Sequence, residues 1–228
     1  MANKLMKTDT NLIVQISTTQ AIMAAGAIIA WFGLGLQFSL LLQHHPYTSM
    51  GEALVRFFSY FTILTNILVA LSFTLPLLAS RAVLGRFFAR AAVQSGTALY
   101  ITMVGVIYAL LLQHLYHPQG WARLADVLVH DIVPLFYVGY WLLLASKAAL
   151  RWQNAALWLL YPFAYLFYTL AHGAFTGWYP YPFINVKEFG YTRVMVNAGE
   201  LTIATFMLGL LMIALARWRA SSARPLPE

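Results

Sequence analysis

The chain has 228 residues, of which 61% are hydrophobic and only 9% are charged, and its mean hydropathy is +0.70. A soluble globular domain carries about 25% charged residues, so this composition excludes an ordinary soluble fold and predicts a protein embedded in a membrane. The absence of cysteine excludes disulfides, thiol nucleophiles and thiolate metal sites. The net charge of +7 does not indicate a nucleic-acid partner, because the basic residues gather at the ends of apolar stretches.

Six apolar stretches follow one another along the chain, at about 12–42, 53–78, 96–115, 126–146, 155–175 and 193–217. A helix needs about 20 apolar residues to cross a bilayer, and each stretch is close to that length or longer. The first is longer than the apolar core of a signal peptide, about 7–15 residues, so we expect an uncleaved span. The sequence predicts one all-α domain over residues 1–228, a polytopic protein with six transmembrane helices.

The distribution of basic residues predicts the orientation of these spans. An even number of spans places both termini on one side, together with ten of the 14 lysines and arginines. Only Arg56, Arg123, Lys187 and Arg193 lie opposite. Because cytoplasmic loops carry the excess of Lys and Arg, both termini are expected in the cytoplasm.

Polar residues form a stripe on the second span. Ser59, Thr62, Thr65 and Asn66 stand at i, i+3, i+6 and i+7, which places them on one face of a helix. In lipid such a stripe faces protein or a cavity. The alternative is structural, with hydroxyls that bond to their own helix or join it to a neighbour.

Other spans bring polar groups to the same level in the outer half of the membrane. The parts of the spans in the cytoplasmic half, by contrast, are nearly all aliphatic. The candidates are His114 and His117 at the end of the third span, Asp126, His130 and Asp131 in the fourth, Tyr161, Tyr165, Tyr168 and His172 in the fifth, and Asn197 and Glu200 in the sixth. Buried ionisable groups in a membrane are functional by default. The convergence therefore predicts a polar pocket.

The pocket residues suggest an ester hydrolase. In the absence of cysteine and of a G-x-S-x-G motif, the available nucleophile is a hydroxyl of the second span and the available base is a histidine. Thr62 or Thr65 could be that nucleophile, with His130 as base and Asp126, Asp131 or Glu200 as its orienting partner. Asn66 or a tyrosine could hold the oxyanion, and Arg56 or Arg193 could anchor a substrate carboxylate. The substrate would be a lipid from the bilayer.

Two other functions use the same residues. A metal-dependent enzyme could be built on His114, His117, His130 and His172, although His-x-x-His alone falls short of a metal signature. A non-catalytic lipid-binding or transport protein could use the pocket without chemistry, although the chain lacks the paired repeats of many transporters.

Three motifs carry a resemblance to a known family. They are Phe61-Thr62 followed by Asn66, His130 shortly before Pro134, and the stretch from His172 through Thr176-Gly177 to Tyr181-Pro182-Phe183. Between about Arg56 and Asn197 the chain resembles the androgen-induced protein family. The members of this family are membrane hydrolases of fatty acid esters of hydroxy fatty acids. The resemblance implies Thr62 as nucleophile, His130 as base, no metal or cofactor, and a bacterial relative in the inner membrane.

Overall fold

The computed structural model describes residues 2–44, 47–147 and 150–222, and within these ranges the chain is helical, with no strand. The α-helices are α1 (Ala2–His44), α2 (Met50–Phe58), α3 (Phe61–Leu78), α4 (Val83–Phe88), α5 (Ala91–Ile107), α6 (Gly120–Val127), α7 (Val133–Leu143), α8 (Gln153–Leu157), α9 (Leu160–Thr176) and α10 (Val186–Ser222). Four shorter segments connect them: η1 (Tyr108–Leu112), η2 (Gln113–Leu115), η3 (Leu128–Ile132) and η4 (Pro182–Ile184). The all-helical class expected from the sequence is confirmed.

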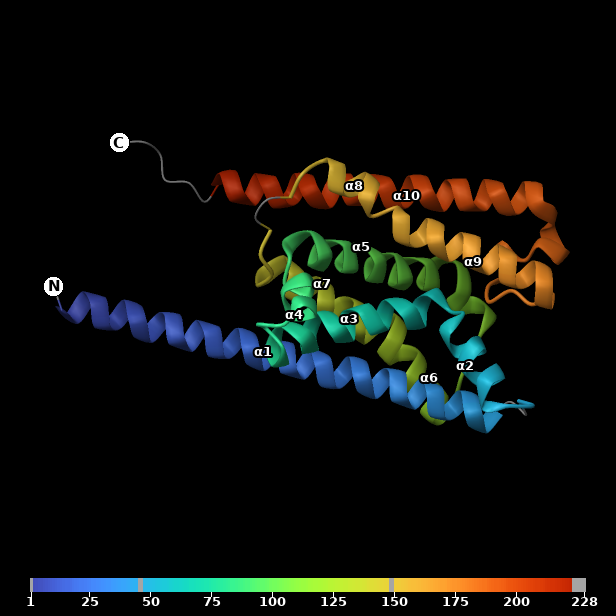
Figure 1. Cartoon of the computed structure of the whole chain (residues 1–228), viewed down its shortest axis with the longest axis horizontal. Coiled ribbons are helices and arrows are strands. Elements are labelled where there is room, and N and C mark those ends of the chain that lie inside the picture. The colour runs from blue at the N-terminus through green and yellow to red at the C-terminus, as the bar shows by residue number, and fades with distance from the viewer. Residues whose placement is uncertain (1, 45–46, 148–149, 223–228) are drawn as a thin grey trace.

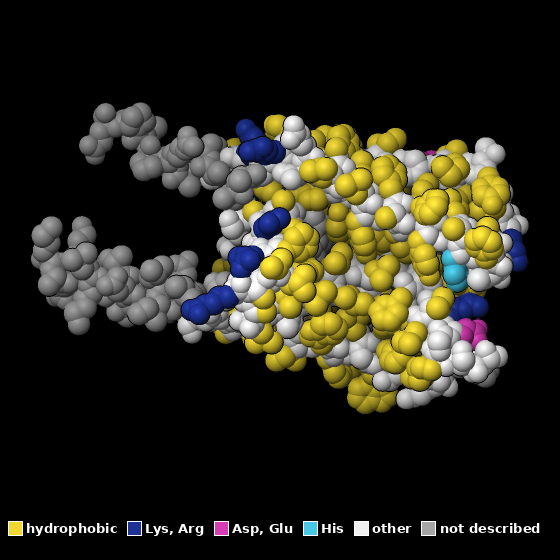
Figure 2. All heavy atoms as spheres, in the orientation of Figure 1, with side chains coloured by type: hydrophobic (Ala, Val, Ile, Leu, Met, Phe, Trp, Pro, Cys, Tyr) yellow, Lys and Arg dark blue, Asp and Glu magenta, His cyan; other side chains and the backbone are white. Residues whose placement is uncertain are grey.

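Five described stretches are long and apolar enough to cross a membrane: Ser17–Gln43, Phe61–Leu78, Ala91–Leu115, Gly120–Leu143 and Val186–Arg219. The stretch expected as a fifth span, at 155–175, is divided into α8 and the 17-residue α9 and is not among them. Apolar side chains cover most of the visible face between the two ends, while lysines and arginines gather mainly at one end (Figure 2). These features support a membrane protein.

The bundle is organised around α3 and α5. Helix α3 packs between α1 and α5, and α5 packs against α7 and α10. As Figure 1 shows, α1 begins and α10 ends at the same end of the bundle, whereas α2 and the loop between α9 and α10 lie at the opposite end. The core contains large buried rings such as Phe73, Tyr137 and Trp141. The Trp141 indole donates to Ser95 Oγ at 2.8 Å, so its buried N–H is satisfied.

The second predicted span is not one continuous helix. Ser59 ends α2, and Tyr60, in an extended conformation, precedes α3, so the expected span at 53–78 is divided into two helices. Thr62 therefore lies in the first turn of α3. The N–H groups of a first helical turn have no partner within their own helix, which makes them available to other groups.

Two π-helical segments interrupt adjacent spans. Segment η1 follows α5 and begins with Tyr108, and η3 lies between α6 and α7 and contains His130. Pro134 has no N–H to donate to the carbonyl of His130 four residues earlier, so the α-helical ladder is broken at this point. π-bulges of this kind occur frequently at functional sites, and these two face each other.

Candidate functional site

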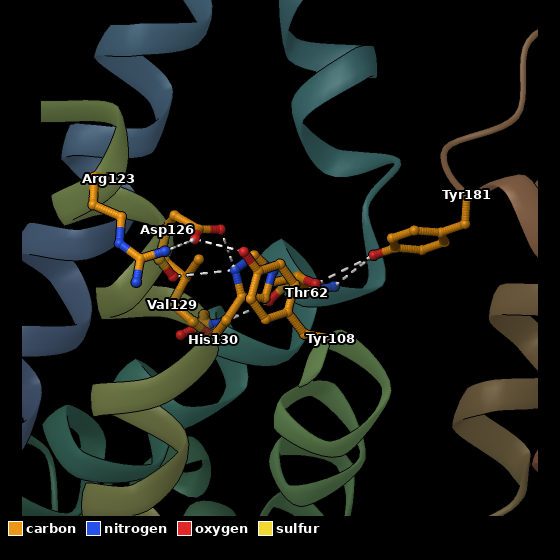
Figure 3. Close-up of polar contacts among 8 residues, drawn as sticks. Thr62, Tyr108, Arg123, Asp126, Val129, His130 and Tyr181 are labelled. Carbon is orange, nitrogen blue, oxygen red and sulfur yellow. Dashed lines mark hydrogen bonds and ion pairs between the residues drawn. The ribbon is translucent and has the colours of Figure 1, made fainter. Parts of the chain in front are cut away.

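His130 is held by a buried carboxylate. Its Nδ1 lies 3.0 Å from Asp126 Oδ1 and 3.1 Å from the Asp126 backbone oxygen (Figure 3). A neutral imidazole that donates from Nδ1 keeps Nε2 as an acceptor. The Asp126 interaction therefore selects the tautomer in which Nε2 can accept a proton.

Tyr108 and Arg123 complete the surroundings of this carboxylate. The Tyr108 hydroxyl donates to Asp126 Oδ2 at 2.5 Å, and Arg123 Nη1 lies 3.7 Å from the same oxygen. The Tyr108 ring is stacked on the His130 imidazole with centroids 3.8 Å apart. Asp126 is thus paired on both oxygens, as a buried carboxylate must be.

Thr62 is contacted by Tyr181 from the opposite side (Figure 3). The Tyr181 hydroxyl lies 3.2 Å from Thr62 N and 3.3 Å from Thr62 Oγ1. The N–H can only donate, so the phenol oxygen accepts from it, and between the two hydroxyls either one can be the donor. When the phenol donates to Oγ1, the hydroxyl hydrogen of Thr62 is free to go to a base. Burial raises the pKa of Tyr181 to about 12, so the phenol is a neutral donor at physiological pH.

Asn66 joins the two halves of the site. Its Nδ2 donates to the Thr62 carbonyl at 2.8 Å and to the Val129 carbonyl at 3.1 Å, and the side chain is fully buried. Val129 directly precedes His130. One amide therefore fixes the distance between the backbone that carries Thr62 and the backbone that carries His130.

A cavity of about 490 Å³ lies between these groups. Its wall includes Thr62, Tyr108, Asp126, His130 and Tyr181. Thr65 is not among the lining residues, and its hydroxyl pairs with Tyr161 OH at 3.2 Å. Of the two threonines that the sequence left as alternatives, Thr62 is the one with access to the cavity.

The remaining residues of the predicted stripe pair with the tyrosines of α9. Ser59 Oγ donates to the Val55 carbonyl at 2.6 Å and lies 2.7 Å from the Tyr168 hydroxyl. Tyr165 OH donates to the Ser59 carbonyl at 2.9 Å. The structural interpretation of the stripe therefore holds for Ser59 and Thr65, whose hydroxyls join α3 and the end of α2 to α9.

The loop after α9 positions Tyr181. Gly177 ends α9 with φ of 70°, and Thr176 Oγ1 donates to the His172 carbonyl at 2.8 Å and accepts from Trp178 N at 3.3 Å. Asn197 on α10 holds the far side of the loop, because its Nδ2 donates to the Phe183 carbonyl at 2.8 Å.

Several other predicted residues lie apart from Thr62 and His130. Arg56 is stacked over the Trp178 ring at 4.0 Å. Asp131 is half-buried, and in the described part of the chain its carboxylate makes no hydrogen bond or ion pair with His130. Asp126, by contrast, bonds to His130 directly. His114, His117, Arg193 and Glu200 are exposed. Asp126 is therefore the carboxylate, among the three that the sequence left open, that orients His130.

The metal alternative has no ligand set in the part of the chain that the structure describes. No group of three or more His, Asp or Glu side chains comes together there to hold an ion. Tyr108 is the site residue that sequence reasoning missed. A tyrosine in an apolar run needs a partner for its hydroxyl, but only the fold shows that the partner is Asp126.

Comparison of the chain with protein-family models, curated proteins and solved structures gave no match. The assignment of the site therefore depends on its geometry.

Proposed function

We propose that the protein is an integral membrane hydrolase that cleaves a lipid ester, with Thr62 as nucleophile and His130 as base. The observation that carries this proposal is that Thr62 and His130 line one cavity, with the imidazole oriented by Asp126 and the threonine hydroxyl within hydrogen-bond distance of Tyr181. An activated hydroxyl, a base and a group that orients the base are the recurring parts of acyl-transfer sites.

The reaction has two steps. Thr62 Oγ1 attacks the ester carbonyl carbon while its proton passes to His130 Nε2, and the departing alcohol takes that proton as the carbon–oxygen bond breaks. Water then attacks the acyl-threonine, losing a proton to His130, and the acid and the free threonine hydroxyl are formed. Tyr181 and the N–H groups of the first turn of α3, of which Thr62 N–H contacts the Tyr181 hydroxyl, are the candidate donors to the oxyanion.

The proposal includes a membrane orientation. We place α8 and α9 together as a sixth span and both termini in the cytoplasm, in the inner membrane of a bacterium. The excess of lysines and arginines at the end where α1 begins supports this, as does the resemblance to the androgen-induced protein family. The cavity then opens in the outer half of the bilayer, where fatty acid esters of hydroxy fatty acids would supply the scissile bond.

Hydrolysis by purified protein in detergent micelles tests the proposal. Thr62→Val retains the volume of the side chain and removes its hydroxyl, so we expect a loss of about 100-fold or more in kcat. Thr62→Ser should retain measurable activity. Thr65→Val is the matched control, one turn along the same helix and outside the cavity, and should retain most of the wild-type rate. Full activity in Thr62→Val would refute the proposal, and binding of esters without turnover would favour the non-catalytic alternative.

A further inference from the structure

A second cavity, of about 110 Å³, adjoins the first. It lies among α3, α5, η1, α9, η4 and α10, and no residue of α1 lines it. Four residues line both cavities and form the wall between them: Thr62, Tyr108, Leu112 and Tyr181. Thr62 is therefore accessible from two compartments.

The two compartments differ in chemistry. The larger one contains Asp126 and His130, whereas the smaller one is lined by no charged residue and no histidine. Hydroxyl-bearing residues do line the smaller cavity, but most of these hydroxyls are used elsewhere. Thr202 and Thr205 donate to carbonyls of their own helix, both at 2.7 Å.

The tyrosines of the smaller cavity are engaged in the same way. Tyr100 OH donates to the Trp158 carbonyl at 2.7 Å, Tyr165 OH to the Ser59 carbonyl at 2.9 Å, and Tyr108 OH to Asp126. These side chains therefore present carbon to the cavity. The exception is the pair of hydroxyls on Thr62 and Tyr181, which bond to each other at the shared wall.

We propose that the smaller cavity binds the acyl chain of the ester, with its carbonyl at Thr62 and its alkyl part directed along α5 and α10. This inference deepens the proposed function, on which it rests, by assigning each side of the scissile bond to a compartment. The lining is almost entirely apolar, which suits an alkyl chain and offers no charged partner for a headgroup. The alcohol part, which has polar atoms to satisfy, occupies the larger cavity beside His130.

Chain-length selectivity provides the first test. Ala198 is buried on α10 and lines the smaller cavity, so Ala198→Phe should shorten it and lower the rate for long acyl chains relative to short ones. Each methylene group excluded from an apolar pocket should change the ratio about tenfold. Ile107→Ala, at a lining position on α5, should shift the preference toward longer chains.

Two controls accompany these variants. Ala122→Phe places the same ring in the larger cavity and should change the preference among alcohols, not among acyl chains. Thr102→Val removes a hydroxyl on α5 that donates to the Ala98 carbonyl of its own helix and lines neither cavity, so it should leave the preference unchanged. An unchanged acyl preference in both Ala198→Phe and Ile107→Ala would overturn the inference.

Cross-linking separates this inference from the proposed function, because it does not require turnover. Thr62→Val protein would be irradiated with a fatty acid that carries a diazirine near its methyl end, and adducts would be mapped by peptide mass. We expect adducts on the α5 and α10 segments that line the smaller cavity, and their loss in a Thr62→Val/Ala198→Phe protein. If the wild-type protein shows no esterase activity, such adducts would support the acyl site while the hydrolase is refuted. Adducts confined to the larger cavity or to the lipid-facing surface would overturn the acyl site even in an active hydrolase.

Discussion

The ring of Tyr108 lies flat against the imidazole of His130, with centroids 3.8 Å apart and planes inclined by only 8°. The same tyrosine donates its hydroxyl to the carboxylate that binds His130. The negative face of an aromatic ring favours a positive charge beside it. Tyr108 is therefore placed to hold the imidazole in one orientation and, in the proposed reaction, to stabilise the imidazolium that His130 would form.

We expect Tyr108→Phe to lower kcat about tenfold or more and to leave KM nearly unchanged. The phenylalanine retains the stacking on His130 but leaves Asp126 Oδ2 without its shortest hydrogen bond, and hydrogen bonds to charged groups contribute about 1.5–3 kcal/mol. Tyr108→Leu removes the stacking as well and should cost more. Steady-state kinetics with a chromogenic lipid ester measures both variants, and equal rates in Tyr108→Phe and wild type would argue against this role.

Asp126, and not Glu200, should be the carboxylate on which activity depends. Asp126→Asn retains the shape of the side chain, but an amide can present its NH₂ group to Nδ1 and stabilise the wrong tautomer of His130, so we expect kcat to fall about 100-fold or more. Glu200→Gln, on the exposed face of α10, should retain the wild-type rate. The reverse order of effects would assign the orienting role to Glu200.

Asn66→Leu should reduce both stability and activity. The leucine fills a similar volume but cannot donate to the carbonyls of Thr62 and Val129, and a buried polar group without its partner costs about 1–3 kcal/mol. Thermal unfolding in detergent and ester hydrolysis measure the two effects. Ser72→Ala is the matched control, because Ser72 is equally buried on α3 but lines neither cavity. Equal activity in the two variants would contradict the joining role of Asn66.

Gly177→Ala should disturb the loop that carries Tyr181. At φ of 70° a side chain with a Cβ costs about 1–2 kcal/mol, and here the new Cβ would also meet the Lys187 side chain. We expect a lower midpoint of thermal unfolding and a lower kcat, because Tyr181 would shift away from Thr62. Gly199→Ala, in the interior of α10 with nothing within 4 Å of the added Cβ, should be neutral or slightly stabilising. A similar response of the two variants would indicate that the loop does not depend on this conformation.

Periodicity predicted much of the site. Thr62 and Thr65 were placed on one helical face of the second span, and the structure has both on α3, with Thr65 paired to Tyr161. Ser59 was placed on the same face, but it lies at the end of α2 and pairs with Tyr168. The three-residue spacing of hydroxyls and the spacing of the tyrosines are both helical, so two such faces can meet. Which hydroxyl remains accessible depends on the loop after α9, whose path no periodicity describes.

Local breaks in the helices could not be predicted in the same way. Serine and tyrosine, unlike glycine and proline, are not residue types that usually end a helix, and apolar residues continue on both sides of Ser59 and Tyr60. The sequence therefore favours one continuous span. The π-helical segment at His130 does have a signal in Pro134, but the segment that begins at Tyr108 contains neither glycine nor proline. The Tyr108–Asp126 contact joins residues 18 apart on different elements, and only tertiary packing produces it.

The exposed positions of His114 and Glu200 have a similar origin. Depth along a span follows from the rise of a helix, but the direction in which a side chain points depends on how the helix is rotated against its neighbours. Both residues are exposed and neither lines the larger cavity, so the level predicted from the sequence did not determine which way their side chains face.

Labelling with a fluorophosphonate probe tests the central claim most directly. Purified wild type, Thr62→Val, Thr65→Val and His130→Ala proteins would be treated with the probe and analysed by intact mass and peptide mapping. We predict one adduct on Thr62 in wild type and in Thr65→Val, and none in Thr62→Val or His130→Ala. An adduct on Thr65, or labelling of Thr62 that persists without His130, would contradict the proposed nucleophile and base.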